Sequence, residues 1–141
     1  MLARFAYSTL LRLATPVYLA RLWWRGRKEP AYRDHWAERL GAGHETAAAG
    51  AFWVHAVSLG ESRAAAALVE ALRKVEPRLK LLLTHGTATG REAGKALLRD
   101  GDVQVWLPYD TPGAVRRFLR RHRPVVGLLM ETEIWPNLLA E

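Results

Sequence analysis

The sequence predicts an α/β protein in which an amphipathic helix precedes a Rossmann-like parallel sheet. Three observations predict it. Residues 1–24 are apolar and aromatic but interrupted by arginines, residues 41–50 have the composition of a linker, and from residue 51 short apolar runs alternate with helical periods. Strands that alternate with helices of this length form parallel sheets covered on both faces. The chain has 141 residues, which is room for one such core and an accessory segment.

Composition and charge narrow the classes of function. The chain has no cysteine, which excludes a disulfide framework and thiolate metal sites and fits a reducing compartment. Of its formal net charge of +7, residues 1–40 carry +5 (eight Lys/Arg against three Asp/Glu), whereas residues 41–141 carry +2 (thirteen against eleven). Because the basic charge belongs to the amino terminus, a nucleic-acid-binding function for the sheet is disfavoured.

The amino-terminal segment, residues 1–24, predicts a helix on a membrane surface. Its longest uncharged run is eight residues, whereas a spanning helix needs ~20 mostly apolar residues. Trp23 and Trp24 suit the headgroup level, and the basic residues around them would attract anionic lipid. No small-residue cleavage site follows, so we expect the segment to be retained. The alternative is an amphipathic helix that packs on its own domain or on another one.

The next segment, residues 25–50, connects this helix to the alternating pattern. Pro30 interrupts it, a short polar helical pattern ends at Gly41, and a small-residue linker follows. We therefore divide the chain into an interfacial anchor helix (1–24), a basic aromatic segment with a linker (25–50) and a Rossmann-like domain (51–141).

The Rossmann-like domain is predicted element by element. The apolar runs predicted as strands are residues 51–57, 79–85, 103–108 and 124–130. The helical periods cover residues 58–75, 89–99 and 111–121, with a further helical segment from residue 131. Helix 58–75 is expected to bury one face, formed by Ala64, Ala65, Leu68, Leu72 and Val75. Thr111 is the expected N-cap of the third helix, with a first-turn proline after it.

Ligands of such sheets bind beyond the carboxyl ends of the strands, which nominates residues 58–61, 84–90 and 131–133. In the first stretch, Ser58 and Glu61 have the spacing of a capping box, so Glu61 can serve as a helix cap. Gly60 would also let a substrate approach the backbone, and a carboxylate at a strand end can act as a general base. The residues leave both roles of Glu61 open.

The other two stretches are also ambiguous. Glu131 and Glu133 leave the fourth strand at the same rim, as site carboxylates or as solvated loop acids. The loop THGTATG, with Thr87, Thr89 and Gly90, opens a helix that could receive a phosphate, but a tight turn with a threonine cap explains it equally well. It is neither a Walker loop nor a GxGxxG fingerprint. The histidines lack metal-ligand spacing, so we predict no metal site.

Five stretches resemble a known family in sequence and order: RLWWRGRKEPAYRDHWAERLG, HAVSLGE, THGTATG, WLPYDTP and METEIWPNL. They are similar to the amino-terminal half of the 3-deoxy-D-manno-octulosonic acid (Kdo) transferases of lipopolysaccharide synthesis. The resemblance implies a two-domain GT-B glycosyltransferase. Its amino-terminal domain would bind the lipid A precursor (lipid IVA), and its carboxyl-terminal domain would bind the donor CMP-Kdo.

The resemblance also implies roles for individual residues. It makes Glu61 the general base of an inverting transfer and Glu131 an acid that stabilises the transition state, with no metal and no cofactor. It places the enzyme on the cytoplasmic face of the bacterial inner membrane, where a lipid acceptor resides. One departure matters: the chain ends at Glu141, before the donor domain. We therefore expect the chain to be inactive alone. The THGTATG loop also carries His85 and Ala88, and its anion-binding role stays a hypothesis. The rival interpretation is a non-catalytic module that binds the membrane surface.

Overall fold

The protein is an α/β domain built on a parallel four-stranded sheet, seen in a computed structural model that describes residues 2–131 and 134–141. The strands run in the order β3-β2-β1-β4 and all neighbours are parallel. Their bounds are Phe52–His55 (β1), Leu81–His85 (β2), Val103–Trp106 (β3) and Val126–Leu129 (β4). The predicted fold class and all four predicted strands are confirmed, each strand being shorter than its apolar run.

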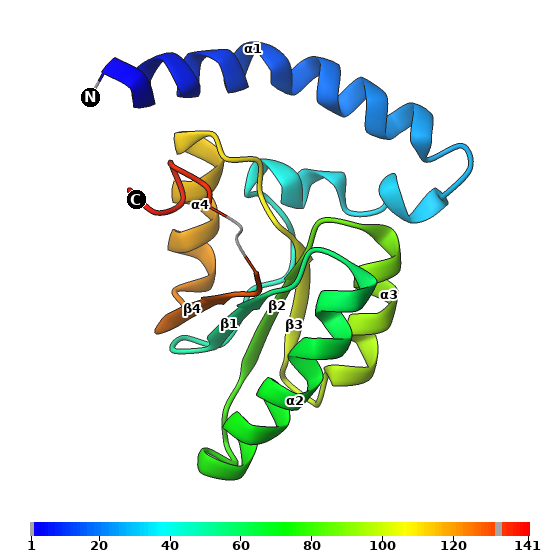
Figure 1. Ribbon diagram of the computed structural model, residues 1–141, viewed down its shortest axis with the longest axis vertical. Helices are drawn as coiled ribbons and strands as arrows, with labels where there is room; N and C mark the ends of the chain where they lie inside the picture. The colour runs from blue at the N-terminus through cyan, green and yellow to red at the C-terminus, as the bar shows by residue number, and fades with distance from the viewer. Residues whose placement is uncertain (1, 132–133) are drawn as a thin grey trace.

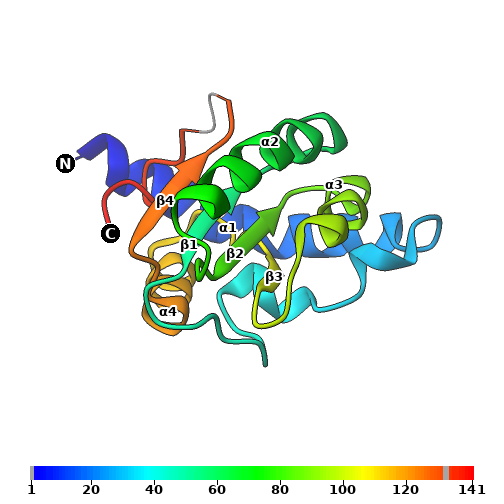
Figure 2. The same ribbon diagram turned by 90° about the horizontal axis from the view of Figure 1, so that it is seen from below.

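Helices cover both faces of the sheet. Helix α2 (Leu59–Val75) and helix α3 (Ala88–Gly94), which continues as a 3-10 turn over Lys95–Leu97, lie on one face, and helix α4 (Pro112–His122) lies on the other (Figure 2). Alternate strand residues therefore enter two cores. Trp53 meets Phe118 edge-to-face at 5.1 Å between ring centroids on the α4 side, whereas Val54 packs with Val69 on the α2 side.

The predicted buried face of helix α2 was only partly correct. Helix α2 buries Ser62, Ala65, Val69 and Arg73, while Ala64 is exposed and Val75 is 86% exposed. The buried face follows spacings of three and four from Ser62, and Arg73 joins it because it pairs with the buried carboxylate of Asp102.

A helical segment was predicted from residue 131, but the described residues 134–141 form no helix, and residues 136–140 form turns. The carboxylate of Asp110 holds these turns against the domain. Its two oxygens accept hydrogen bonds from the backbone N–H groups of Asn137 (2.9 Å) and Leu138 (2.7 Å). These bonds fasten the segment to the loop after β3, and Asn137 is fully buried.

Helix α1 (Leu2–Arg25) runs along the edge of the sheet where the strands end (Figure 1). One side of it packs on the domain: Tyr7 donates to Asp110 at 3.0 Å, Ser8 donates to Asn137 at 2.9 Å, and Tyr18 meets Tyr109 edge-to-face. The sequence left two interpretations of this segment, a helix on a membrane surface and a helix packed on its own domain. The structure shows the packing. No helix in the described part of the chain has the length and apolar character needed to cross a membrane.

The segment between α1 and β1 packs against the α/β unit. It forms 3-10 helices over Pro30–Tyr32 and Trp36–Leu40 where a helical pattern was predicted, and the predicted stop at Gly41 is confirmed by a left-handed φ of 72°. Glu38 accepts hydrogen bonds from the backbone of Trp106 and from Arg91, both at 2.8 Å, and Ala47 lies in the core beside α4. The boundaries proposed for separate units at residues 24 and 50 stay a prediction.

Candidate functional site

A cleft of about 420 Å³ lies between α1 and the carboxyl ends of β1, β2 and β3. Leu11, Ala14, Thr15 and Tyr18 of α1 line one wall. The opposite wall consists mainly of residues at and just after the strand ends, namely His55, Val57, Gly86, Leu107, Pro108 and Tyr109. Parallel α/β sheets bind ligands at this edge, so the cleft marks the candidate site.

Glu61 lies beside the cleft, held by a capping box at the start of α2. Ser58 is the N-cap, and its hydroxyl accepts a bond from the Glu61 N–H and donates to Glu61 Oε1 at 2.9 Å. Glu61 Oε2 accepts from the backbone N–H of Val57 at 2.7 Å. The predicted cap is therefore confirmed. Two bonds also fix the carboxylate next to a residue that lines the cleft.

His55 ends β1 at the floor of this site and is fully buried. Its Nδ1 lies 3.1 Å from the carbonyl oxygen of Thr84 and 2.9 Å from the Thr84 hydroxyl. Burial lowers the pKa of His55 to about 4, although the bond to Thr84 and the negative charge of Glu61 act in the opposite direction. The imidazole is therefore neutral at pH 7. The carbonyl of Thr84 suits a proton on Nδ1, whereas the Thr84 hydroxyl can either donate to this nitrogen or accept from it.

Glu131 follows the neighbouring strand β4 and is exposed. The strand's direction continues to Met130, whose N–H donates to the carbonyl of His55 at 2.9 Å. Glu131 then adopts a left-handed φ of 60°, which is uncommon for a residue with a side chain and is enriched at functional sites. Glu61 and Glu131 thus follow adjacent strands at the same edge. Glu133 lies outside the described residues.

Gly60 and the THGTATG loop differ in how open they are. A Cβ added at Gly60 would meet only the Ser58 hydroxyl, at 3.9 Å, so the backbone there is accessible. Gly90 is buried, and a Cβ there would lie 2.7 Å from the carbonyl oxygen of Val57. The geometry gives Gly90 a packing role, and whether either glycine binds substrate stays a prediction.

Thr87 and Thr89 differ in the same way. The Thr87 hydroxyl donates to Val57 O at 2.9 Å and accepts from the Gly90 N–H at 3.1 Å, so it is engaged as the N-cap of α3. Thr89 is exposed. Because α3 has only seven residues and its cap is satisfied internally, the structure adds no support to an anion site in this loop. The substrate-binding roles of both threonines stay predictions.

Sequence reasoning missed several residues of the cleft. Arg39, Tyr109 and Trp135 line it, yet the sequence pattern marks none of them as a site residue. Arg39 comes from the segment before the sheet, and Trp135 from the stretch after β4 that was predicted as a helix. Of the three, only Tyr109 could have been found from the sequence, because it directly follows a predicted strand. Among the described residues, no group of three or more His, Asp or Glu is placed to hold a metal ion.

The fold and this edge define a Rossmann-like α/β domain with its candidate site under an added amino-terminal helix. A family model described as "3-Deoxy-D-manno-octulosonic-acid transferase (kdotransferase)" matches residues 34–141. The chain therefore belongs to the Kdo transferase family, and the resemblance seen in the sequence is confirmed. No solved structure matches the chain.

Curated relatives agree with this assignment. A 3-deoxy-D-manno-octulosonic acid transferase of Bordetella pertussis is 48% identical over 99% of this chain and 34% of its own length. The Haemophilus influenzae transferase is 36% identical over 96% of this chain and 32% of its own length. A probable mitochondrial transferase of Arabidopsis thaliana is 34% identical over 94% of this chain and 30% of its own length. The chain thus spans about a third of the length of these three relatives.

Proposed function

We propose that this chain is the acceptor-binding part of an enzyme that transfers Kdo from CMP-Kdo to the lipid A precursor, lipid IVA, with inversion at the anomeric carbon. Family membership supports the reaction class. The observation that carries the mechanism is the carboxylate of Glu61, fixed by two hydrogen bonds beside the cleft at the sheet's carboxyl edge. No cofactor is proposed.

The hydrogen bonds of Glu61 leave it able to act as a base. Each carboxylate oxygen has two lone pairs and accepts one bond in the structure, Oε1 from Ser58 and Oε2 from Val57. A free lone pair on either oxygen can accept the proton of an acceptor hydroxyl. As that hydroxyl oxygen bonds to the anomeric carbon of Kdo, the bond to CMP breaks and CMP leaves with the electron pair. The cap and the base are therefore compatible roles of one side chain.

Glu131 is proposed to stabilise the transition state from the adjacent strand end. Two features support this role: its place two residues after Leu129, which pairs in register with His55, and its left-handed backbone. A carboxyl group there would settle charge and orientation around the reacting centre.

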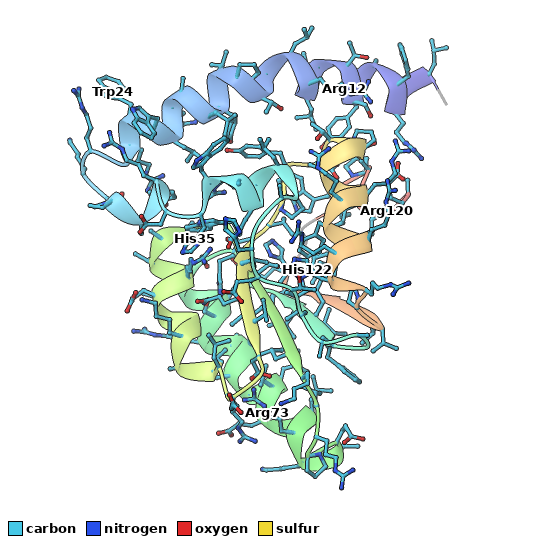
Figure 3. All side chains as sticks on the ribbon, turned by 180° about the vertical axis from the view of Figure 1, so that it is seen from behind. Arg12, Trp24, His35, Arg73, Arg120 and His122 are labelled. Atoms are coloured by element: carbon cyan, nitrogen blue, oxygen red, sulfur yellow. The ribbon has the colours of Figure 1, made fainter. Side chains whose placement is uncertain are left out.

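Attachment to the cytoplasmic face of the inner membrane is proposed through α1. The side of α1 turned away from the domain exposes large apolar side chains: Leu2, Leu10, Leu13, Val17 and Trp24. Arg12 and Arg21 are also exposed on this helix, and Trp24 lies near its carboxyl end (Figure 3). A helix with one packed side and one exposed apolar side flanked by arginines suits the interface of an anionic membrane, where a lipid acceptor resides.

A chimera tests the transfer reaction. This chain replaces the matching third of the Bordetella pertussis transferase, and transfer of labelled Kdo from CMP-Kdo to lipid IVA is measured. The parent enzyme is the positive control, and its remaining two thirds without this chain are the negative control. We expect the chimera to transfer Kdo. A folded chimera that binds CMP-Kdo but transfers nothing to lipid IVA would contradict the proposal.

The exposed side of α1 also favours a second candidate function, a non-catalytic module that binds the membrane surface. Both candidates predict that the chain sediments with vesicles of phosphatidylethanolamine and phosphatidylglycerol, and that Leu13→Glu with Val17→Glu releases it. Val75→Glu is the control, since Val75 is 86% exposed at the far end of α2. Only the first candidate predicts Kdo transfer by the chimera, so the two assays together separate them.

A further inference from the structure

His85 ends strand β2 with its imidazole fully buried behind the candidate site. The residues that line the cleft do not include it. A buried polar side chain needs hydrogen-bond partners, and the partners of this imidazole lie on β1, on β3 and in the first turn of α2. His85 therefore connects the sheet to the turn that carries Glu61.

The imidazole takes the place of a backbone donor at the point where the ladder between β1 and β2 ends. Ala56 still belongs to the ladder, because its N–H donates to the carbonyl of Thr84 at 3.0 Å. A regular parallel ladder would next use the Gly86 N–H as the donor to the Ala56 carbonyl, but this N–H donates to Val57 at 3.2 Å. His85 Nδ1 lies 2.8 Å from the oxygen of Ala56 and supplies the missing donor.

Contacts on both sides of the ring place its proton on Nδ1. Burial lowers the pKa of His85 to about 4, so the ring carries one proton at pH 7. The carbonyl of Ala56 only accepts, so Nδ1 donates to it. On the other side, Gln104 Nε2 lies 2.7 Å from the carbonyl of Arg91 and 3.0 Å from His85 Nε2. This amide group donates one hydrogen to the carbonyl and the other to the unprotonated Nε2.

The hydroxyl of Ser62 does not change this assignment. It lies 3.3 Å from His85 Nδ1, but two backbone carbonyl oxygens are closer to it, at 2.8 and 3.1 Å. The single hydroxyl proton therefore goes to a carbonyl, which leaves the oxygen of Ser62 as an acceptor.

One peptide group connects the imidazole to Glu61. The C=O of Ala56 and the N–H of Val57 belong to the same planar trans peptide, in which they point in opposite directions. His85 holds the oxygen, and the N–H on the other side donates to Glu61 Oε2 at 2.7 Å. A donor to the carbonyl also polarises the peptide and strengthens the bond that its N–H makes. Rotation of this peptide would remove one of the two bonds that fix the carboxylate of Glu61.

We propose that His85 is a positioning residue for Glu61: through the peptide group between Ala56 and Val57, it sets the direction and strength of a hydrogen bond that orients the base. The inference rests on the proposed role of Glu61 in Kdo transfer. The hydrogen bonds run from Gln104 through His85 and this peptide to the carboxylate, across β3, β2 and β1 to the start of α2. A purely structural His85 would affect stability and leave the rate of the chemical step unchanged.

Three substitutions separate the donor from the bulk of the side chain. His85→Asn places an amide N–H near the position of Nδ1, whereas His85→Leu has nearly the same shape and no donor. His85→Gln is polar, but its amide lies further out, toward Gln104, and is not placed to donate to Ala56. His122→Gln is the control, because it removes a buried imidazole from α4, on the opposite face of the sheet. If His85→Leu fails to fold, His85→Gln carries the test.

Hydrogen exchange of the 141-residue chain, followed by nuclear magnetic resonance, tests the hydrogen bond directly. The rate at the Val57 amide is divided by the rate at the Ala56 amide, whose bond to Thr84 reports a general loss of stability. We expect this ratio to rise about tenfold in His85→Leu and His85→Gln, the effect of losing one hydrogen bond, and to stay unchanged in His85→Asn and His122→Gln. An unchanged ratio in all four variants overturns the inference.

The same substitutions in the chimera test the effect on Kdo transfer. We expect kcat to fall about 10- to 100-fold in His85→Leu and His85→Gln, as for a misplaced catalytic group, and to recover most of this loss in His85→Asn. The KM for lipid IVA should stay within about twofold, because His85 lies outside the cleft. Equal kcat values in His85→Leu and His85→Asn, or a kcat that only follows stability in all four variants, overturn the inference.

Failure here and failure of the proposed transfer are distinguishable. An active chimera whose kcat is the same with leucine and asparagine at position 85 removes His85 from the mechanism and leaves Glu61 in its role. A parent chimera that transfers no Kdo contradicts the transfer reaction, and the exchange ratio at Val57 then decides whether His85 holds Glu61 in place.

Discussion

The carboxylate of Glu61 accepts a hydrogen bond from the backbone N–H of Val57 at 2.7 Å, and Val57 itself lines the cleft beneath α1. The first turn of α2 and the wall of the cleft are therefore one connected structure. The carbonyl oxygen of Val57 accepts a hydrogen bond from the Thr87 hydroxyl, which connects the start of α3 to the same residue. Substitutions around Val57 can therefore distinguish residues that stabilise this edge of the sheet from residues that contact a substrate.

Gly60→Ala should leave the fold intact. The added Cβ meets only the Ser58 hydroxyl at 3.9 Å, and φ at Gly60 is not positive, so the free energy of unfolding is expected to stay the same or rise by up to about 1 kcal/mol. Kdo transfer by the chimera should fall if an acceptor approaches this backbone. Urea unfolding measures the stability of the variant, and the transfer assay measures its activity. Full activity in a stable Gly60→Ala protein would remove Gly60 from the binding site.

Gly94→Ala should be destabilising for a packing reason. A Cβ at Gly94 would clash with the imidazole of His85 and lie 2.7 Å from the side-chain nitrogen of Gln104, which donates to His85 Nε2 at 3.0 Å. We expect a loss of about 1–3 kcal/mol in urea unfolding. Gly113→Ala is the matched control, because its nearest neighbour is the flexible end of Arg117 at 3.5 Å. Equal stabilities of the two variants would refute this account.

Asp102→Ala should destabilise the end of the sheet farthest from the cleft. The buried carboxylate pairs with Arg73 and accepts from the backbone N–H groups of Leu81 and Arg99, both at 2.8 Å. Its removal leaves a buried guanidinium without a counter-charge, a loss of about 3–5 kcal/mol. The exposed neighbour Asp100→Ala is the control.

Stability should fall on mild acidification. Burial lowers the pKa values of His55, His85 and His122 to about 4, against about 6.5 in the unfolded chain. Between pH 6.5 and 4 the unfolded state therefore binds more protons, so stability is fully present above pH 6.5 and decreases as the pH falls. Each histidine contributes a slope of about 1.4 kcal/mol per pH unit in the steepest part of this window.

Urea unfolding at several pH values between 7 and 4.5 checks this slope. His122 Nδ1 accepts from the backbone N–H of Ala47 at 3.2 Å, a bond that a glutamine oxygen can replace. His122→Gln should therefore reduce the slope by about a third. Stability that does not change between pH 7 and 5 would show that the three imidazoles are not held neutral by burial.

The sequence pattern predicted the sheet well because its strands appear as short apolar runs, continuous in β2, which is buried along its whole length. The capping box of Ser58 and Glu61 was equally readable, since it depends on local spacing. The failures have tertiary causes. Arg73 is buried because Asp102 lies opposite it, and the turn at Asn137 is held in place by the carboxylate of Asp110.

The cleft was beyond sequence reasoning for the same reason. Arg39, His55, Tyr109 and Trp135 come from four separate segments, and only the docking of α1 and of residues 26–50 brings them to one cavity. Local periodicity carries no information about such docking. The strand-end rule located the right edge, but it could not name the side chains that other segments contribute.

The most direct test of the mechanism is the rate of Kdo transfer by a Glu61→Gln chimera at saturating CMP-Kdo and lipid IVA. Glutamine keeps the capping box but cannot take a proton, so stability and acceptor binding should match the parent while the rate falls about 10²–10⁴-fold. Glu70→Gln, an exposed substitution on the same helix, should have no effect. A Glu61→Gln chimera with the parent rate would show that Glu61 is only a helix cap, and the account of the base would be wrong.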